Sequence, residues 1–261
     1  MLHFNDFDNF SKSKIKFIKS LRLKKYRLQE NSFILEGAKN VKLLLESDYE
    51  ISMVVATASF LHEYTNLLLK RNIEIFQVNE KVLSSLGTFQ ENNAALAVAT
   101  IPANKPFTIH KHQYGLVLDG ISDPGNLGTI IRVADWYGLA GIICSNNTVE
   151  RYNPKVLHAS MGSFINTKVY YTDLPSYLAQ TSLPIIGTFT KGENLHDPQT
   201  VWPSEGLIII GNEAKGISET LMPYIQQKIS IPNYGHAESL NAALATAIVS
   251  DNLIRVKVNS K

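Results

Sequence analysis

Cysteine is almost absent from the 261 residues of this sequence: the one thiol, Cys144, lies in the apolar run GIIC. A single thiol excludes an internal disulfide framework and a cysteine-rich zinc site, and it is typical of a reducing compartment. No apolar run reaches the ~20 residues of a membrane span, and the N-terminus lacks the basic start and apolar stretch of a signal peptide. We therefore expect a cytoplasmic protein without membrane contact.

Several catalytic and cofactor motifs are also missing. No G-x-S-x-G elbow indicates a serine hydrolase, and neither the G-x-G-x-x-G fingerprint nor the Gly-Lys-Ser/Thr of a P-loop is present. His110 and His112 have no third ligand at metal-site spacing, so we expect no metal site. His158, His196 and His236 are interpreted as structural or surface residues. Cys144 is interpreted as a core thiol.

Charge is unevenly distributed along the chain. The net charge is only +2, but residues 12–27 hold eight Lys or Arg and no acid, which leaves 17 basic and 23 acidic residues elsewhere. A short cationic segment on a mildly acidic body indicates contact with a polyanion, and we favour nucleic acid. The alternative is the solvated face of an N-terminal helix that packs through Phe17, Ile18 and Leu21.

Residues 1–101 are predicted to form a first α/β domain of ordinary size. Extended and helical patterns alternate from residue 30 onward, with strands expected in SFILE, ISMVVAT, IEIFQV and AALAVATI. Residues 102–113 contain two prolines and no periodicity, so we interpret them as a linker.

Residues 114–261 carry a second alternating series. Its predicted strands are 115–119, 141–145, 168–171, 184–188, 207–211 and 228–231, and a long final helix is predicted at 239–255. The run LIIIG is apolar without alternation, as expected for a strand covered on both faces. Strands that alternate with helices imply a parallel sheet with right-handed crossovers.

Three segments place glycine and a short polar cluster at a predicted strand end, where α/β folds bind ligands. They are 119–132, 207–217 and 229–248. In the first, Asn126 and Arg132 follow a tight turn at the start of an otherwise apolar helix. In the second, Glu213 lies between Gly211 and Gly216. A plain strand–turn–helix connection and a surface carboxylate are the respective alternatives.

The third segment, IPNYGHAESLNAALATAI, is the most specific of the three. Pro232 and Gly235 predict a loop, and Glu238 or Ser239 can cap the helix that follows. The alanine-rich face of that helix is interpreted as core or dimer interface. Ser239 and Asn241 are the polar exceptions at its start, and a purely structural cap is the alternative for Ser239.

Together the segments resemble the signature motifs of the SpoU (TrmH) family of RNA ribose 2′-O-methyltransferases, within the SPOUT class. The match reads N-x-G-x-x-x-R from Asn126 to Arg132, I-G-x-E-x-x-G at 210–216, and I-P-x-x-G followed by S-L-N at 231–241. NPKVLHASMGS (153–163) also resembles this family. Residues 30–101 resemble the substrate-binding domain of ribosomal-RNA members. Asn233 stands where the family commonly carries Met.

The resemblance implies a fold that the patterns alone do not predict. In this family the C-terminal segment threads through a loop to form a deep trefoil knot, against the general rule for protein chains. The expected architecture is a smaller α/β substrate-binding domain at 1–101 and a parallel-sheet SPOUT methyltransferase domain at 114–261. Family members are homodimers, and Arg132 is implied to reach a site that the partner subunit completes.

The implied reaction is S-adenosylmethionine-dependent methylation of a ribose 2′-hydroxyl, with ribosomal RNA as the expected substrate. The implied cofactor contacts are Thr188, Gly211, Ile231 and Leu240, largely through backbone atoms. The implied catalytic residues are Asn126, Arg132, Glu213, Ser239 and Asn241. Asn126 and Glu213 would orient Arg132 or the ribose, and Ser239 and Asn241 would fix the loop and the target nucleotide.

The role of Arg132 has two versions. The family proposal makes it the general base, but a guanidinium has a pKa of about 12.5–13.8 in water. We favour a charged Arg132 that binds substrate phosphate and lowers the pKa of the attacking hydroxyl. Three other functions remain open: a catalytically silent RNA-binding member, an enzyme with a different phosphate-bearing cofactor, and a methyltransferase acting on tRNA.

Overall fold

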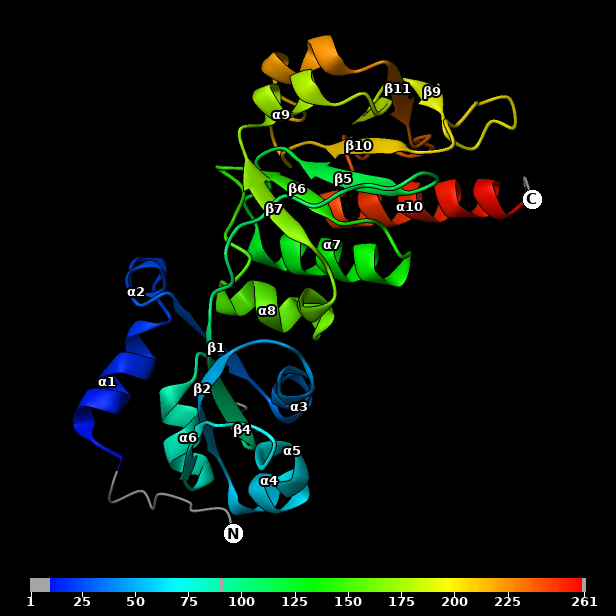
Figure 1. Cartoon of the computed structure of the whole chain (residues 1–261). Coiled ribbons are helices and arrows are strands. Elements are labelled where there is room, and N and C mark those ends of the chain that lie inside the picture. The colour runs from blue at the N-terminus through cyan, green and yellow to red at the C-terminus, as the bar shows by residue number, and fades with distance from the viewer. Residues whose placement is uncertain (1–9, 90–91, 260–261) are drawn as a thin grey trace. The chain divides into compact units, whose positions relative to one another are not determined.

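The computed structural model describes residues 10–89 and 92–259, with side chains up to Arg255. The chain folds into two compact units (Figure 1). The first contains the described residues up to Ala103 together with Tyr152–Ile165, and the second contains Asn104–Arg151 and the described residues from Asn166 onward. Within the described part of the chain, no helix combines the length and the hydrophobicity that crossing a membrane requires.

The first unit is built on a mixed four-stranded sheet with the order β1-β4-β2-β3. β1 and β2 both pair antiparallel with β4, and β2 pairs parallel with β3. The strands are β1 (Ser32–Glu36), β2 (Ile51–Ala56), β3 (Glu74–Gln77) and β4 (Ala95–Thr100). The helices are α1 (Lys12–Ser20), α2 (Lys24–Gln29), α3 (Ala38–Glu46), α4 (Ala58–Glu63), α5 (Thr65–Leu68), α6 (Glu80–Leu86), α8 (Pro154–Ser160) and the 3-10 helix η2 (Ser163–Ile165).

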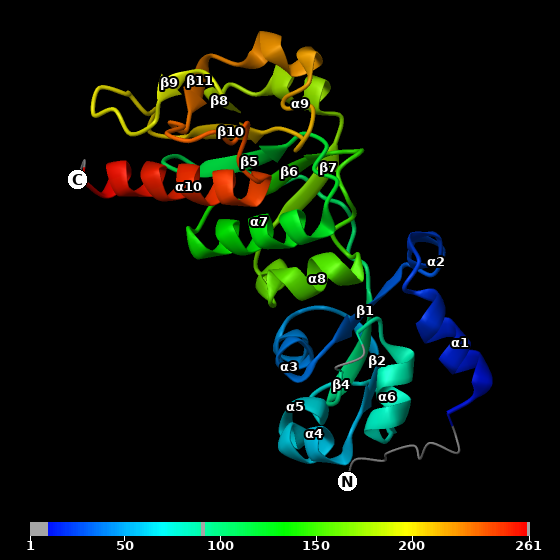
Figure 2. The same cartoon turned by 180° about the vertical axis from the view of Figure 1, so that it is seen from behind.

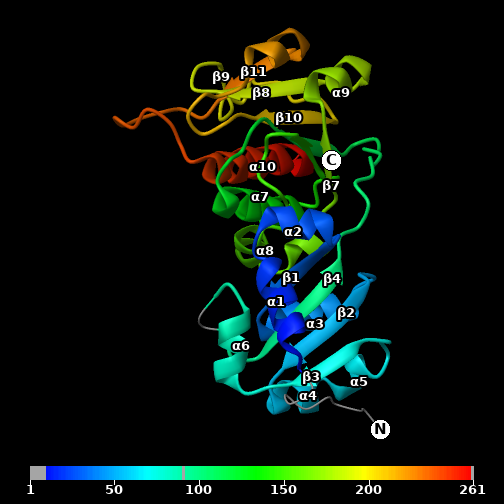
Figure 3. The same cartoon turned by 90° about the vertical axis from the view of Figure 1, so that its left-hand side faces the viewer.

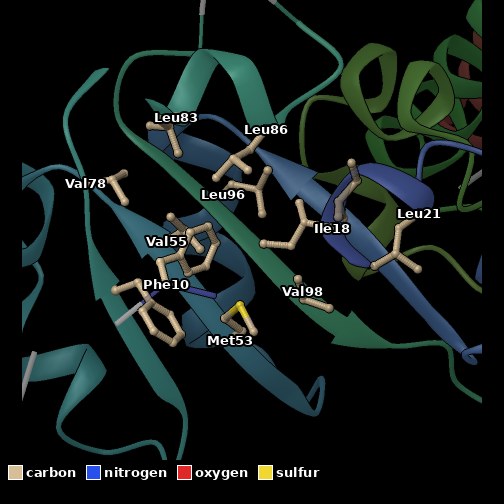
Figure 4. Close-up of a cluster of buried hydrophobic side chains, with 12 residues drawn as sticks. Phe10, Ile18, Leu21, Met53, Val55, Val78, Leu83, Leu86, Leu96 and Val98 are labelled. Atoms are coloured by element: carbon tan, nitrogen blue, oxygen red, sulfur yellow. The ribbon is translucent and has the colours of Figure 1, made fainter. Parts of the chain in front are cut away.

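A hydrophobic core joins α1 and α6 to one face of this sheet (Figure 4). Ile18 of α1 and Leu21 just after it are fully buried against Leu83 and Leu86 of α6 and the strand residues. Each buried Leu or Ile contributes about 1.5–3 kcal/mol of transfer free energy. Segment 12–27 thus packs through Ile18 and Leu21, with Phe17 partly buried, as the alternative to the favoured nucleic-acid contact expected.

Three of the eight basic residues in that segment form hydrogen bonds or an ion pair within the first unit. Arg27 is buried, and its Nη1 donates to the carbonyl oxygens of Leu21 and Arg22 at 2.8 Å. The Nη2 of Arg22 donates to the carbonyl oxygen of Leu86 at 2.7 Å. Lys14 forms an ion pair with Glu74 at 2.6 Å. The other five are exposed: Lys12, Lys16, Lys19, Lys24 and Lys25.

The segment Tyr152–Ile165 packs in the first unit through aromatic rings. Phe33 of β1 lies 4.6 Å from Tyr152 and 6.2 Å from Phe164, measured between ring centroids, and Tyr49 lies 5.9 Å from Phe164. Helix α8 contacts β1 directly. A stretch from within the predicted methyltransferase domain thus completes the core beside the first sheet.

The second unit contains a seven-stranded sheet in which every pair is parallel, with the order β7-β6-β5-β10-β8-β11-β9. The strands are β5 (Tyr114–Leu118), β6 (Ile142–Ser145), β7 (Val169–Thr172), β8 (Ile185–Phe189), β9 (Glu193–Asn194), β10 (Gly206–Ile210) and β11 (Gln227–Ser230). The predicted α/β class and parallel sheet are confirmed. The ends of the predicted strands agree with the observed ends within a residue or two. Strand β9 was not predicted.

Helices cover both faces of this sheet. Helices α7 (Pro124–Trp136) and α10 (Ala242–Asn259) pack together on one face, and α9 (Leu174–Gln180) and the 3-10 helix η3 (Glu219–Tyr224) lie on the other (Figures 1 and 2). All five residues of β10 are buried, as the apolar run predicted. Cys144 of β6 is also fully buried, and burial raises the pKa of its thiol, so its assignment to the core is confirmed.

Candidate active site

The loops that follow β5 and β10 are tied together at the carboxyl edge of the parallel sheet. The buried carboxylate of Asp119 accepts a hydrogen bond from the backbone N–H of Ser218 at 2.7 Å. One residue further, the carbonyl oxygen of Gly120 accepts from Nδ2 of Asn212 at 2.7 Å. Gly120 has a φ of 72°, a region that favours glycine. These bonds fix the first two motif loops relative to each other.

The turn at 212–216 holds Glu213 at the edge of the sheet. The backbone N–H of Asn212 donates to the carbonyl oxygen of Gly216, and the reciprocal bond has the same length, 2.9 Å. The chain doubles back so closely that a side chain at Gly211 would collide with the backbone of Gly216. Gly216 itself has a φ of 70°. The two glycines that flank Glu213 are therefore required by the backbone.

Side chains from all three motifs form one hydrogen-bonded chain. Nδ2 of Asn241 donates to Oδ1 of Asn126 at 2.8 Å, and Nδ2 of Asn126 donates to Oε1 of Glu213 at 2.7 Å. Asn126 lies in the first turn of α7, where Asp123 caps the helix by accepting from the Asn126 backbone N–H at 2.8 Å. Three of the predicted catalytic residues, far apart in sequence, thus meet.

The second carboxylate oxygen of Glu213 has its own donors, which the sequence did not reveal as site residues. Both the Ser122 hydroxyl and Nδ2 of Asn212 lie 3.4 Å from Oε2. Oδ1 of Asn212 accepts from the backbone N–H groups of Ala214 and Lys215 at 3.0 Å, as is usual for Asn in turns. An Asn after a strand-ending glycine is a turn signal, but nothing in the sequence shows that its amide would face Glu213.

The cap of the last helix differs from the prediction. Oδ1 of Asn241 accepts from the backbone N–H groups of Ala243 and Leu244 at 2.9 and 3.3 Å, so Asn241 caps α10. The prediction that Glu238 or Ser239 performs this role is wrong, because the helix begins at Ala242. An Asn side chain offers both an acceptor and donors. Asn241 therefore caps its helix with the oxygen and reaches Asn126 with the nitrogen.

A pocket of about 530 Å³ opens beside this chain of side chains. Its lining includes the residues predicted to contact a cofactor together with two predicted catalytic residues: Thr188, Gly211, Ile231, Leu240, Glu213 and Ser239. The volume lies within the range of about 300–1,000 Å³ that is usual for small-molecule sites. Thr188 donates through Oγ1 to the carbonyl oxygen of Ile209 at 2.8 Å, which fixes its side chain at the pocket wall.

The segment 231–240 forms one wall of the pocket. Its backbone N–H and carbonyl groups form no hydrogen bond with backbone groups of the described residues. Asn233 closes the segment instead: its Oδ1 accepts from the Gly235 N–H at 2.8 Å, and its Nδ2 donates to the carbonyl oxygen of Ala237 at 2.6 Å. Apart from the Gly235 N–H and the Ala237 carbonyl oxygen, the backbone along this wall is consequently available to a ligand, as backbone-mediated cofactor contacts require.

Arg132 is not joined to the cluster within this chain. It lies on the exposed face of α7, six residues after Asn126, which corresponds to about 9 Å along the helix axis. It does not line the pocket, and the described residues provide no ion-pair partner for it. The structure therefore brings together Asn126, Glu213 and Asn241, places Ser239 in the pocket wall, and leaves Arg132 outside.

Two parts of the sequence match known protein families. Residues 113–251 match the SpoU rRNA methylase family, and residues 12–97 match the MRM3-like substrate binding domain. The chain belongs to the SpoU rRNA methylase family. The predicted family and enzyme class, an RNA methyltransferase, are confirmed.

Similar proteins extend over nearly the whole chain. The 23S rRNA (guanosine(2553)-2′-O)-methyltransferase RlmP of Bacillus subtilis is 31% identical over 240 residues, which cover 90% of this chain and 94% of that protein. A TrmH-family protein of Porphyromonas gingivalis has 31% identity and a TM-score of 0.81, covering 94% and 98%. An AdoMet-bound rRNA methyltransferase from Sinorhizobium meliloti has 25% identity and a TM-score of 0.87, covering 97% and 98%.

The hydrogen-bonded chain predicts a pH-dependent loss of stability in Asn126→Asp. The new carboxylate cannot donate to Glu213, and repulsion between two like charges raises the pKa of the pair. The destabilisation, about 1 kcal/mol or about 2–4 °C in Tm, should be largest at pH 8 and shrink toward pH 5, where one carboxyl regains its proton. Thermal unfolding measures it, with the exposed Asn146→Asp as control. A deficit that does not change with pH would contradict the geometry.

Proposed function

We propose that this protein transfers a methyl group from S-adenosylmethionine to a ribose 2′-hydroxyl of ribosomal RNA in the cytoplasm. The observation that carries the proposal is the bonded chain Asn241–Asn126–Glu213, assembled from the three family motifs beside a pocket of 530 Å³. The ribosomal RNA named for the Bacillus subtilis relative, together with the substrate-binding region at 12–97, favours ribosomal RNA over tRNA.

The residues present fit S-adenosylmethionine. Apolar side chains of the lining, such as Ile210, Ile231 and Leu240, suit the face of a nucleobase. The carboxylates of Glu213 and Glu238 belong to the same lining and suit a cationic ligand. When bound, the cofactor supplies an electrophilic methyl group. Thr188, Gly211, Ile231 and Leu240 are the residues proposed to hold it.

The proposed knot is supported by family membership and by the path of the C-terminus. After β11 the chain leaves the sheet, forms the pocket wall at 231–240, and returns as α10 against α7. In a knotted arrangement the loops after β10 and β11 would be held together by the chain itself. A crystal structure in which α10 can be withdrawn without passing through a loop would overturn this proposal.

The chain's own residues contribute mainly position and charge to the proposed reaction. Glu213 is held by donors on both oxygens, so its carboxylate is fixed before substrate arrives, and fixed geometry can supply much of the lowering of the barrier. A charged Arg132 binds the substrate phosphate and stabilises the oxygen that loses its proton. That proton leaves through water or phosphate, and Ser239 and Asn241 hold the loop at the target nucleotide.

The role of Arg132 predicts the outcome of Arg132→Lys. Lysine keeps the charge but loses the planar fork of donors, so kcat should fall about 10- to 100-fold while the pH–rate profile keeps its shape. Radiolabelled methyl transfer to ribosomal RNA between pH 6 and 10 measures this, with Arg132→Ala as the reference for complete loss. A nearly normal rate with a new, lower apparent pKa would favour the general-base role instead.

We propose a homodimer formed through α7 and α10. Arg132 and Trp136 lie one helical turn apart on α7, and Trp136 is 81% exposed. Leu244 of α10, the helix that packs on α7, is 57% exposed. Large exposed apolar side chains on adjoining helices are typical of interfaces. A partner seated here would also bring its own surface close to Arg132.

Trp136→Glu should convert the dimer to a monomer and abolish methyl transfer, because a buried Trp commonly contributes 2 kcal/mol or more to an interface. Light scattering after gel filtration gives the mass. Leu69→Glu, at an exposed position of α5's C-cap in the first unit, is the matched control and should leave the mass unchanged. A Trp136→Glu protein that remains dimeric would exclude this interface.

The exposed lysines of the basic segment are proposed to contact RNA phosphates. Deleting the segment would also remove the buried Ile18, Leu21 and Arg27, so single substitutions are the appropriate test. Lys24→Ala and Lys25→Ala should each lower RNA affinity and reduce the magnitude of the slope of log K against log salt by about 0.7–0.9. Fluorescence anisotropy at several salt concentrations measures the slope. The control is Lys70→Ala, and slopes equal to wild type would reject the contact.

A further inference from the structure

An exposed tyrosine stands at the rim of the proposed cofactor pocket. The segment between β11 and α10 projects from the second unit (orange, left side of Figure 3). Tyr234 lies in this segment, lines the pocket and is 90% exposed. An aromatic side chain this exposed contributes little to folding, and at the rim of a pocket it is available for contact with a ligand.

The turn that carries Tyr234 is closed by hydrogen bonds that do not involve the Tyr234 side chain. The two hydrogen bonds of Asn233, to the Gly235 N–H and the Ala237 carbonyl oxygen, close the turn around it. The tyrosine ring is thus displayed on a turn that its neighbour stabilises. A side chain presented in this way loses little conformational freedom on binding, because Tyr has only two side-chain torsions.

A lysine side chain lies on the second motif loop, which also lines this pocket. Lys215 is exposed, lies in the turn 212–216, and belongs to the pocket lining together with Tyr234. Its backbone N–H is fixed by Oδ1 of Asn212 at 3.0 Å. The rim therefore offers one aromatic face and one ammonium group from two separately anchored loops. An unpaired nucleotide presents a base and a phosphate that match these two groups.

We propose that Tyr234 stacks on an unpaired base of the RNA substrate next to the methylated ribose, and that Lys215 contacts the adjoining phosphate. The proposal rests on the proposed function, because a hydroxyl can reach the pocket only if neighbouring nucleotides cross its rim. Stacking tolerates any base, so Tyr234 selects unpaired RNA over duplex RNA without reading its sequence.

Tyr234→Ala should raise KM for unmodified 23S ribosomal RNA transcribed in vitro about 5- to 20-fold and leave kcat within about twofold. Tyr234→Phe keeps the ring and should behave as wild type. Val201→Ala, which removes another exposed apolar side chain of the second unit outside the pocket lining, is the matched control. Calorimetry with S-adenosylmethionine and the mass in solution should be the same for all four proteins.

Four results would overturn the stacking role. They are an unchanged KM in Tyr234→Ala, weakened S-adenosylmethionine binding (a cofactor contact instead), an altered mass (a subunit contact), and equal loss of affinity for single-stranded and duplex RNA oligomers. The proposed function fails separately if the wild-type protein methylates no ribosomal RNA. In that case binding of a single-stranded RNA oligomer to wild type, Tyr234→Ala and Tyr234→Phe still tests the stacking.

Discussion

The hydrogen-bonded chain Asn241–Asn126–Glu213 is the constraint on which the candidate site depends. Its middle residue, Asn126, accepts from Asn241 through Oδ1 and donates to Glu213 through Nδ2, and a planar amide can do both at once. The last residue accepts only, so a carboxylate suits it. Asn241 also caps α10, which links the position of the last helix to the orientation of Glu213. The geometry of the site therefore depends on how α10 packs.

The parallel sheet makes this meeting possible. Strands β5, β10, β8 and β11 are neighbours in this order and run in the same direction, so the motif loops after β5, β10 and β11 emerge at one edge. Additional hydrogen bonds between side chains and backbone then tie the loops together, including the one from the Ser218 N–H to the buried Asp119 carboxylate. A rigid edge explains how residues more than 80 positions apart in sequence can approach within hydrogen-bonding distance.

The sequence predicted the elements better than the contacts between them. Apolar runs such as LIIIG identify buried strands because hydrophobicity is a local property of the chain. The cap at Asn241 was assigned to Glu238 or Ser239 because several residues there can cap, and only the observed start of α10 decides among them. The position of Asn212 in the site could not be predicted because its bond to Gly120 joins two loops that are far apart in the sequence. The packing of Tyr152–Ile165 in the first unit likewise depends on aromatic contacts that no local pattern encodes.

We propose that the three motif loops form one site that methylates a ribosomal RNA sugar. The most direct test of this proposal is a map of 2′-O-methylated nucleotides in total RNA from cells that carry the intact gene, a deletion, or Glu213→Ala. We expect one ribosomal RNA position to lose its methyl group in both the deletion and the variant. A ribosomal map that is identical in all three strains, or a change confined to tRNA, would contradict the account.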